Sequence, residues 1–126
     1  MDKYSINLAE QQHMRSKWRK ASKDGIIMLE SETTTLTIRN RTLKVYGSPL
    51  SPYFCDWAFA YPIEADPWRI PGDVDIIITH CPPFGIMDRV PSLPGDGYVG
   101  CPQLRKHLER VQPKLHVFGH IRKLLT

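Results

Sequence analysis

The sequence predicts an α/β fold in which parallel strands are joined through a helix, and three observations support this. Residues 75–79 form an isoleucine-rich run typical of a strand buried on both faces of a parallel sheet. Residues 100–111 carry apolar side chains at helical spacing, and Pro113 follows where that helix should end. Residues 115–118 form a second apolar run. Strand, helix and strand in this order make a crossover unit, whose two strands are parallel.

The N-terminal part of the chain is less regular. Residues 6–21 favour a helix, but their apolar positions form only a ragged stripe, so we expect a peripheral helix. After the turn signal Asp24-Gly25, residues 26–29 predict a short strand. Residues 33–38 and 43–46, joined by a tight connection at residues 39–41, predict a β-hairpin.

Composition narrows the classes of protein that this chain can be. With 126 residues and 41% hydrophobic content, the chain is expected to form a single domain. The net charge of +4 arises largely from a basic run at residues 15–23, which is typical of a solvated helix face, so nucleic acid is not a favoured partner. No apolar run approaches a membrane span, and the first residues lack the apolar core of a signal peptide.

The cysteines favour a reducing environment. Cys55, Cys81 and Cys101 are widely spaced and include no C-x-x-C pair, which argues against both a disulfide framework and a structural zinc site. We therefore expect a cytoplasmic protein without a membrane partner, while the oligomeric state stays open.

Two histidines follow the two predicted parallel strands. His80 comes directly after residues 75–79 and before two prolines, and His120 follows residues 115–118 after a glycine. Because the carboxyl ends of neighbouring parallel strands meet at one edge of a sheet, we expect these two imidazoles to lie side by side. Neutral imidazoles are good ligands for Zn, Mn or Fe. A lone histidine at a strand end is also often a hydrogen-bonded structural residue, so both interpretations stay open.

A hydrolytic two-metal site would need carboxylates as well, one of them bridging. Six aspartates are available, but none has a strand-end setting that marks it as a bridge; they are Asp56, Asp66, Asp73, Asp75, Asp88 and Asp96. His116 and His107 are expected to be packing residues. Residues 84–97 are long and aperiodic enough to be a functional loop that forms a lip over a site.

Other catalytic arrangements fit less well. Ser48 lacks the G-x-S-x-G setting of a nucleophile elbow. Cys81 and His80 are neighbours on an extended chain and should point to opposite sides, which disfavours a Cys-His dyad. Neither common glycine-rich phosphate loop occurs in the sequence.

Several collinear motifs resemble the second half of calcineurin-like metallophosphoesterases, and in particular the metallophosphoesterase-domain-containing group. They are Gly47-Ser48-Pro49, Ser51-Pro52, Asp56-Trp57-Ala58-Phe59, residues 78–83, Val99-Gly100-Cys101 and residues 113–121. The resemblance covers about residues 40–121. It implies a layered β-sandwich with flanking helices, and a pair of Mn, Fe or Zn ions that hydrolyses small phosphomonoesters or phosphodiesters. Residues 1–126 would then form one incomplete domain of partial metallophosphoesterase fold, without its N-terminal half.

The resemblance also assigns ligands, residue by residue. His80 and His120 correspond to two ligands of the same metal ion. The family's second histidine of G-H-x-H corresponds to Arg122, which stays protonated and has no lone pair to offer. The family's D-x-H, G-D and G-N-H motifs, which supply the bridging aspartate, the remaining ligands and the transition-state histidine, do not occur here. No catalytic residue is therefore assigned.

These departures lead to three expectations. The chain should hold at most one weakly bound ion and should be inactive alone, as a truncated phosphoesterase. The alternative is a pseudoenzyme or interaction module that keeps the scaffold without catalysis. Without the first sheet, the strand edge near Ile76, Ile77 and Ile78 should be unpaired and prone to aggregation.

Overall fold

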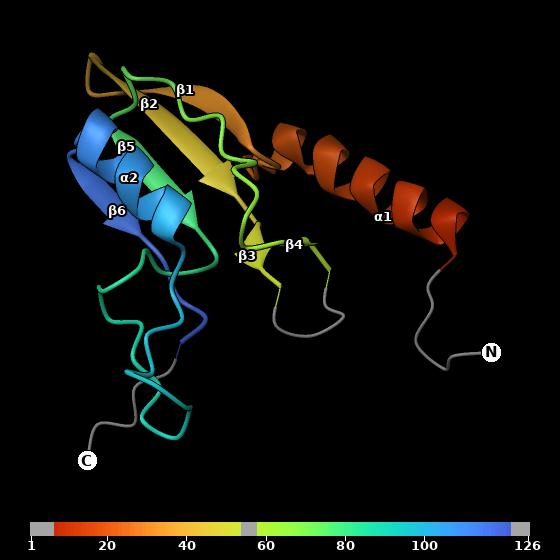
Figure 1. Ribbon diagram of the computed structural model, residues 1–126. Helices are drawn as coiled ribbons and strands as arrows, with labels where there is room; N and C mark the ends of the chain where they lie inside the picture. The colour runs from red at the N-terminus through yellow and green to blue at the C-terminus, as the bar shows by residue number, and fades with distance from the viewer. Residues whose placement is uncertain (1–6, 54–57, 122–126) are drawn as a thin grey trace.

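A four-stranded sheet is the central feature of the computed structural model, which describes residues 7–53 and 58–121 (Figure 1). Its strands lie in the order β1-β2-β5-β6; they are β1 (Glu32–Ile38), β2 (Arg41–Ser48), β5 (Ile76–Thr79) and β6 (Leu115–Val117). The pair β1-β2 is antiparallel, whereas β2-β5 and β5-β6 are parallel. The mixed α/β class and the predicted parallel crossover are therefore confirmed.

The β1-β2 hairpin agrees with its prediction. Its two connecting residues, Arg39 and Asn40, have φ values of 49° and 61°. Two consecutive residues with positive φ are typical of the two-residue turns that match the twist of paired strands. The register runs from Glu32 opposite Gly47 to Ile38 opposite Arg41.

The prediction of a strand at residues 26–29 is wrong. These residues form no strand, and Leu29 instead packs against Gly47 in β2. A Cβ atom added to Gly47 would lie 2.7 Å from the Cβ of Leu29, so glycine at this position permits the close approach. Leu29 is therefore placed by packing onto the sheet rather than by ladder pairing, whereas Ile26 and Ile27 are about half exposed.

A second helix covers one face of the sheet. This helix, α2 (Pro102–Val111), lies across β5 and β6 in Figure 1 and places Leu104 in a core with Tyr46 and Ile77. Cys101 caps the helix, and its Sγ accepts a hydrogen bond from the Leu104 N–H at 3.3 Å. The predicted helix and its core-facing stripe are therefore confirmed.

In the described part of the chain, the opposite face of the sheet is covered by Leu29 at Gly47 in β2 but is open over β5 and β6. Ile38, Ile78, Leu115 and Val117 are between 45% and 51% exposed, although all are large apolar residues. The prediction that residues 75–79 are buried on both faces is therefore wrong, because α2 covers only the face that carries Ile77. The predicted unpaired edge at Ile76–Ile78 is also wrong, since β5 lies between β2 and β6.

A small second sheet lies next to the strand ends. It pairs β3 (Ser51–Pro52) with β4 (Ala60–Tyr61) in parallel. Asp56 and Trp57 of the motif Asp56-Trp57-Ala58-Phe59 lie outside the described residues, as does Cys55.

The N-terminal helix is peripheral, as expected. This helix, α1 (Leu8–Lys20), begins with a capping box formed by Asn7 and Glu10, buries none of its residues, and points away from the sheet in Figure 1. Its last turns are tied back by ion pairs from Arg15 to Glu30 and from Arg19 to Glu32, and the 3₁₀ turn Ala21–Asp24 follows. In the part of the chain that is described, no helix has the length and apolar character to cross a membrane.

Candidate functional site

His80 and His120 lie side by side at the carboxyl ends of β5 and β6. Their ring centroids are 4.4 Å apart, and the ring planes are inclined at 54°. The backbone fixes this arrangement, because the His80 N–H donates to the Ser48 carbonyl at 3.3 Å and the Gly119 N–H donates to the His80 carbonyl at 3.2 Å. His120 has a φ of 71°, an uncommon conformation for a residue with a side chain. The predicted meeting of these two imidazoles is confirmed.

The electrostatic setting favours a neutral ring at His120. Partial burial, together with the charge that a neighbouring His80 would carry, lowers the pKa of His120. A neutral imidazole keeps a nitrogen lone pair, which it needs in order to bind a metal ion.

The chemistry of this donor set suits part of a metal site. Two neutral imidazoles resemble half of the four-ligand shell that zinc prefers. Within residues 7–53 and 58–121, no group of three or more His, Cys, Asp or Glu side chains is placed to hold an ion. The described residues therefore fit as a ligand pair and do not complete a site, and Arg122 lies outside them.

Four aspartates among the described residues form hydrogen bonds or ion pairs away from the two rings. Asp66 contacts His107, Asp73 pairs with Lys44, and Asp75 pairs with Lys114 and accepts the Lys44 N–H. Asp88 is fully buried and accepts hydrogen bonds from the N–H groups of Gly85 and Gly100. Asp56, another of the candidate carboxylate ligands, lies outside the described residues.

The two other strand and helix histidines have structural partners. His116 Nε2 lies 2.8 Å from Thr79 Oγ1, and burial lowers the pKa of His116 to about 4. His107, predicted to pack, instead forms a polar bridge. Its Nε2 lies 2.9 Å from Asp66 Oδ2, and Arg110 Nη2 donates to its Nδ1 at 3.0 Å.

A cavity of about 350 Å³ opens beside His120. Its walls come from β3, from the proline segment after β5, and from the loop at residues 84–100. The sequence indicated residues 84–97 as a lip over a site; Val90 and Leu93 from this stretch line the cavity, together with Val99 just beyond it. Sequence analysis did not identify these lining residues individually, because the loop has no periodicity that distinguishes an inward from an outward side chain.

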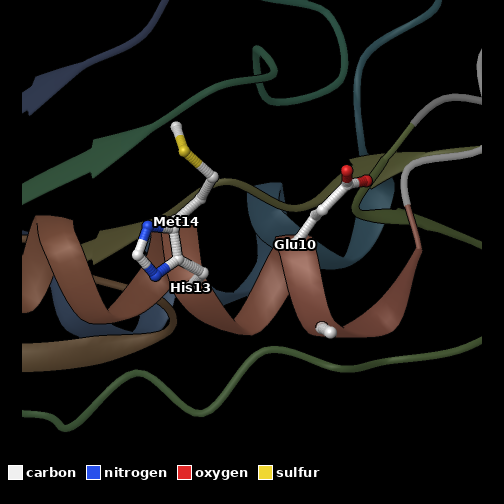
Figure 2. Close-up of a pocket in the computed structure, with 4 residues that line it drawn as sticks. Glu10, His13 and Met14 are labelled. Carbon is white, nitrogen blue, oxygen red and sulfur yellow. The ribbon is translucent and has the colours of Figure 1, made fainter.

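Two further hollows lie in the described part of the chain. One, of about 370 Å³, is lined by His80 together with Leu29 and Gly47. The other follows α1, where Glu10, His13 and Met14 project from successive turns (Figure 2). Because all of its lining residues come from one peripheral helix, it is a surface furrow rather than a candidate site.

Comparison with known proteins places the chain among metallophosphoesterase relatives. It is 44% identical over 101 residues to "Metallophosphoesterase domain-containing protein 1" of Homo sapiens, a match covering 76% of this chain and 29% of that protein. It is 32% identical over 124 residues to a UPF0046 protein of Caenorhabditis elegans, covering 90% of this chain and 31% of that protein. No protein-family model matches the chain.

Two other matches are more restricted. A "Probable rhamnogalacturonate lyase C" of Emericella nidulans is 39% identical over 102 residues, but these are only 9% of that protein, so its name says little about the matched part. A solved crystal structure matches with a TM-score of 0.54 and 20% identity, covering 90% of this chain and 47% of that one. The match to this solved structure concerns the fold alone.

The resemblance that the motifs indicated is thus found again in whole-sequence comparison. The chain spans about 29% of the length of the human protein that it matches at 44% identity. Over three quarters of its own length, this chain is a homologue of metallophosphoesterase domain-containing protein 1.

Proposed function

We propose that this chain carries the C-terminal half of a metallophosphoesterase domain and contributes two ligands to its metal centre. The parent reaction would be the hydrolysis of small phosphomonoesters or phosphodiesters with a pair of Mn, Fe or Zn ions. The single observation that carries this proposal is the contact between the His80 and His120 rings at the ends of neighbouring parallel strands.

The open sheet face supports the proposed partial fold. Ile78, Leu115 and Val117 are exposed on the face opposite α2, where a second layer of a β-sandwich would bury them. Relatives more than three times as long as the matched segment leave ample chain for such a layer. The complete fold would then be a layered sandwich with flanking helices.

In this proposal the residues of the chain hold and orient one metal ion, but they do not form a complete catalytic site. When bound, the metal pair would polarise the phosphoryl group and activate a water molecule. His80 and His120 would supply neutral nitrogen ligands to one ion, fixed by the backbone bonds from Gly119 and to Ser48. Nothing in the described residues bridges a second ion. We therefore expect at most one weakly held ion and no turnover by this chain alone.

The test of this proposal is an assay with a defined control. The purified chain is incubated with Mn²⁺ and an aryl phosphodiester, beside its His80→Ala variant. The expected result is no turnover above the metal blank for either protein. Turnover by the wild-type chain that disappears in His80→Ala would contradict the proposed inactivity, while supporting the metal role of His80.

A second candidate function is an interaction module that keeps the scaffold without catalysis. The observation that favours it is the same open face, since exposed apolar patches often mark interaction surfaces. The buried free thiols of Cys81 and Cys101 agree with a reducing, cytoplasmic setting for either function. Metal binding at the histidine pair separates the two, because a metal-free module has no need of it.

A further inference from the structure

The cavity beside His120 is built to take an apolar group. Three side chains of the loop at residues 84–100, Val90, Leu93 and Val99, form one wall, and Pro82 and Ile121 contribute further apolar surface. Among residues 7–53 and 58–121, no Asp, Glu, Lys or Arg side chain lines the cavity. A charged ligand group placed against these apolar side chains would lose hydration.

The wall of the cavity is preformed by hydrogen bonds within the loop. The fully buried Asp88 carboxylate accepts the N–H groups of Gly85 and Gly100 at 2.9 and 2.8 Å. The Val90 N–H donates to the Gly97 carbonyl at 2.7 Å, and the Val99 N–H donates to the Asp88 carbonyl at 3.2 Å. These bonds tie both arms of the loop together and fix the positions of Val90 and Val99.

The position of the cavity links it to the histidine pair. His120 is both a lining residue of the cavity and the ring neighbour of His80. A phosphoryl group held at the pair would therefore lie beside a residue that lines the cavity. A volume of about 350 Å³ lies at the lower end of the range for small-molecule pockets, which suits one ring or a short alkyl group.

We propose that this cavity receives the organic substituent of the phosphoester, and that it selects a small, uncharged aromatic or aliphatic group. This inference rests on the proposed function, because it places the phosphoryl group at His80 and His120. It adds a substrate class, since esters with an apolar alcohol would be preferred over sugar phosphates and over esters with a second charged group.

The test compares three non-hydrolysed probes in the presence of Zn²⁺: phenylphosphonate, methylphosphonate and inorganic phosphate. Binding is followed by NMR titration of the backbone and methyl signals of the full chain. Phenylphosphonate is expected to bind at least about tenfold more tightly than methylphosphonate, and to shift the methyl signals of Val90, Leu93 and Val99. Leu93→Asp should abolish the difference between the two phosphonates.

Matched variants keep the result interpretable. Leu115→Asp places the same charge on an exposed strand residue away from the cavity, and should keep the full preference for phenylphosphonate. If Leu93→Asp unfolds, the methyl shifts of the wild-type chain still report where the ring binds.

The outcomes separate this inference from the function on which it rests. Equal affinity for the two phosphonates, lost for both in His80→Ala, would overturn the apolar pocket and leave the metal-centre proposal intact. Failure of all three probes to bind would contradict the proposed function, and this inference with it.

Discussion

The imidazoles of His80 and His120 meet at 4.4 Å between ring centroids because β5 and β6 are adjacent and parallel, so that both chains leave the sheet at the same edge. The Gly119 N–H, which donates to the His80 carbonyl, continues the pairing for one step beyond the strands. The arrangement is therefore a property of the sheet, and changes elsewhere in the chain should leave it intact as long as the sheet folds.

The first prediction concerns the contact between α2 and the sheet. Leu104 is fully buried against Tyr46 and Ile77, so Leu104→Ala should lower the free energy of unfolding by about 2–5 kcal/mol. Leu115→Ala, on the open face where half of the side chain is already exposed, should cost less than about 1 kcal/mol. Urea unfolding of both variants measures the difference. Equal costs would show that α2 is not anchored as described.

The second prediction concerns the loop at residues 84–100. Asp88→Ala removes the acceptor of the Gly85 and Gly100 N–H groups, which should cost about 1–3 kcal/mol and speed amide exchange in the loop. Asp96→Ala, at an exposed position of the same loop, is the control and should change neither quantity. Hydrogen exchange followed by mass spectrometry measures both. Unchanged loop protection in Asp88→Ala would contradict the role given to this carboxylate.

The third prediction concerns pH and His116. Burial lowers the pKa of folded His116 to about 4, from an ordinary value of 6.5, so the unfolded chain binds this proton more readily than the folded chain. Stability should therefore fall as the pH decreases from about 6.5 to about 4. In His116→Gln this part of the pH dependence should be reduced.

Asp73 and Asp75 affect stability at a lower pH than the range from about 6.5 to about 4, so they do not obscure this test. Hydrogen bonding, in each case the largest cause, lowers the pKa values of Asp73 and Asp75, so the stability they contribute is lost only under more acidic conditions. Urea midpoints at pH 7.0 and 5.0 for wild type and His116→Gln give the comparison. An identical pH dependence in the two proteins would contradict a buried neutral His116.

The fourth prediction concerns the open apolar face of the sheet. Ile78, Leu115 and Val117 together form a patch that water contacts unfavourably, so the chain should associate as its concentration rises. Val117→Lys should reduce this association, whereas Met87→Lys, the same kind of change at a more exposed residue away from the sheet, should not. Sedimentation velocity over a range of concentrations measures the effect. A wild-type chain that stays monomeric throughout would contradict the prediction.

The elements that sequence could predict are those whose signal is local. The isoleucine run, the helical stripe around Leu104 and the β-branched hairpin each specify their own structure, and their order implies the parallel pairing that brings the histidines together. His80 and His120 could be predicted as site residues for the same reason, because each comes soon after a recognisable strand.

The features that sequence could not predict depend on partners distant in the chain. Ile76, Ile77 and Ile78 look alike in sequence, yet α2 covers Ile77 and leaves Ile78 exposed. Residues 26–29 have strand composition, but Gly47 offers Leu29 a packing site on the sheet instead. The cavity wall depends on Asp88, whose bonds to Gly85 and Gly100 span the whole loop.

Metal binding to the histidine pair is the most direct test of the metal-centre proposal. Zn²⁺ binding is measured by isothermal titration calorimetry for the wild-type chain, for His80→Ala and His120→Ala, and for His13→Ala as a control on the exposed helix α1. We expect one weakly bound ion per wild-type chain, at least about tenfold weaker binding in either strand-end variant, and no change in His13→Ala. Zinc affinity that is the same in all four proteins would contradict the assignment of His80 and His120 as ligands.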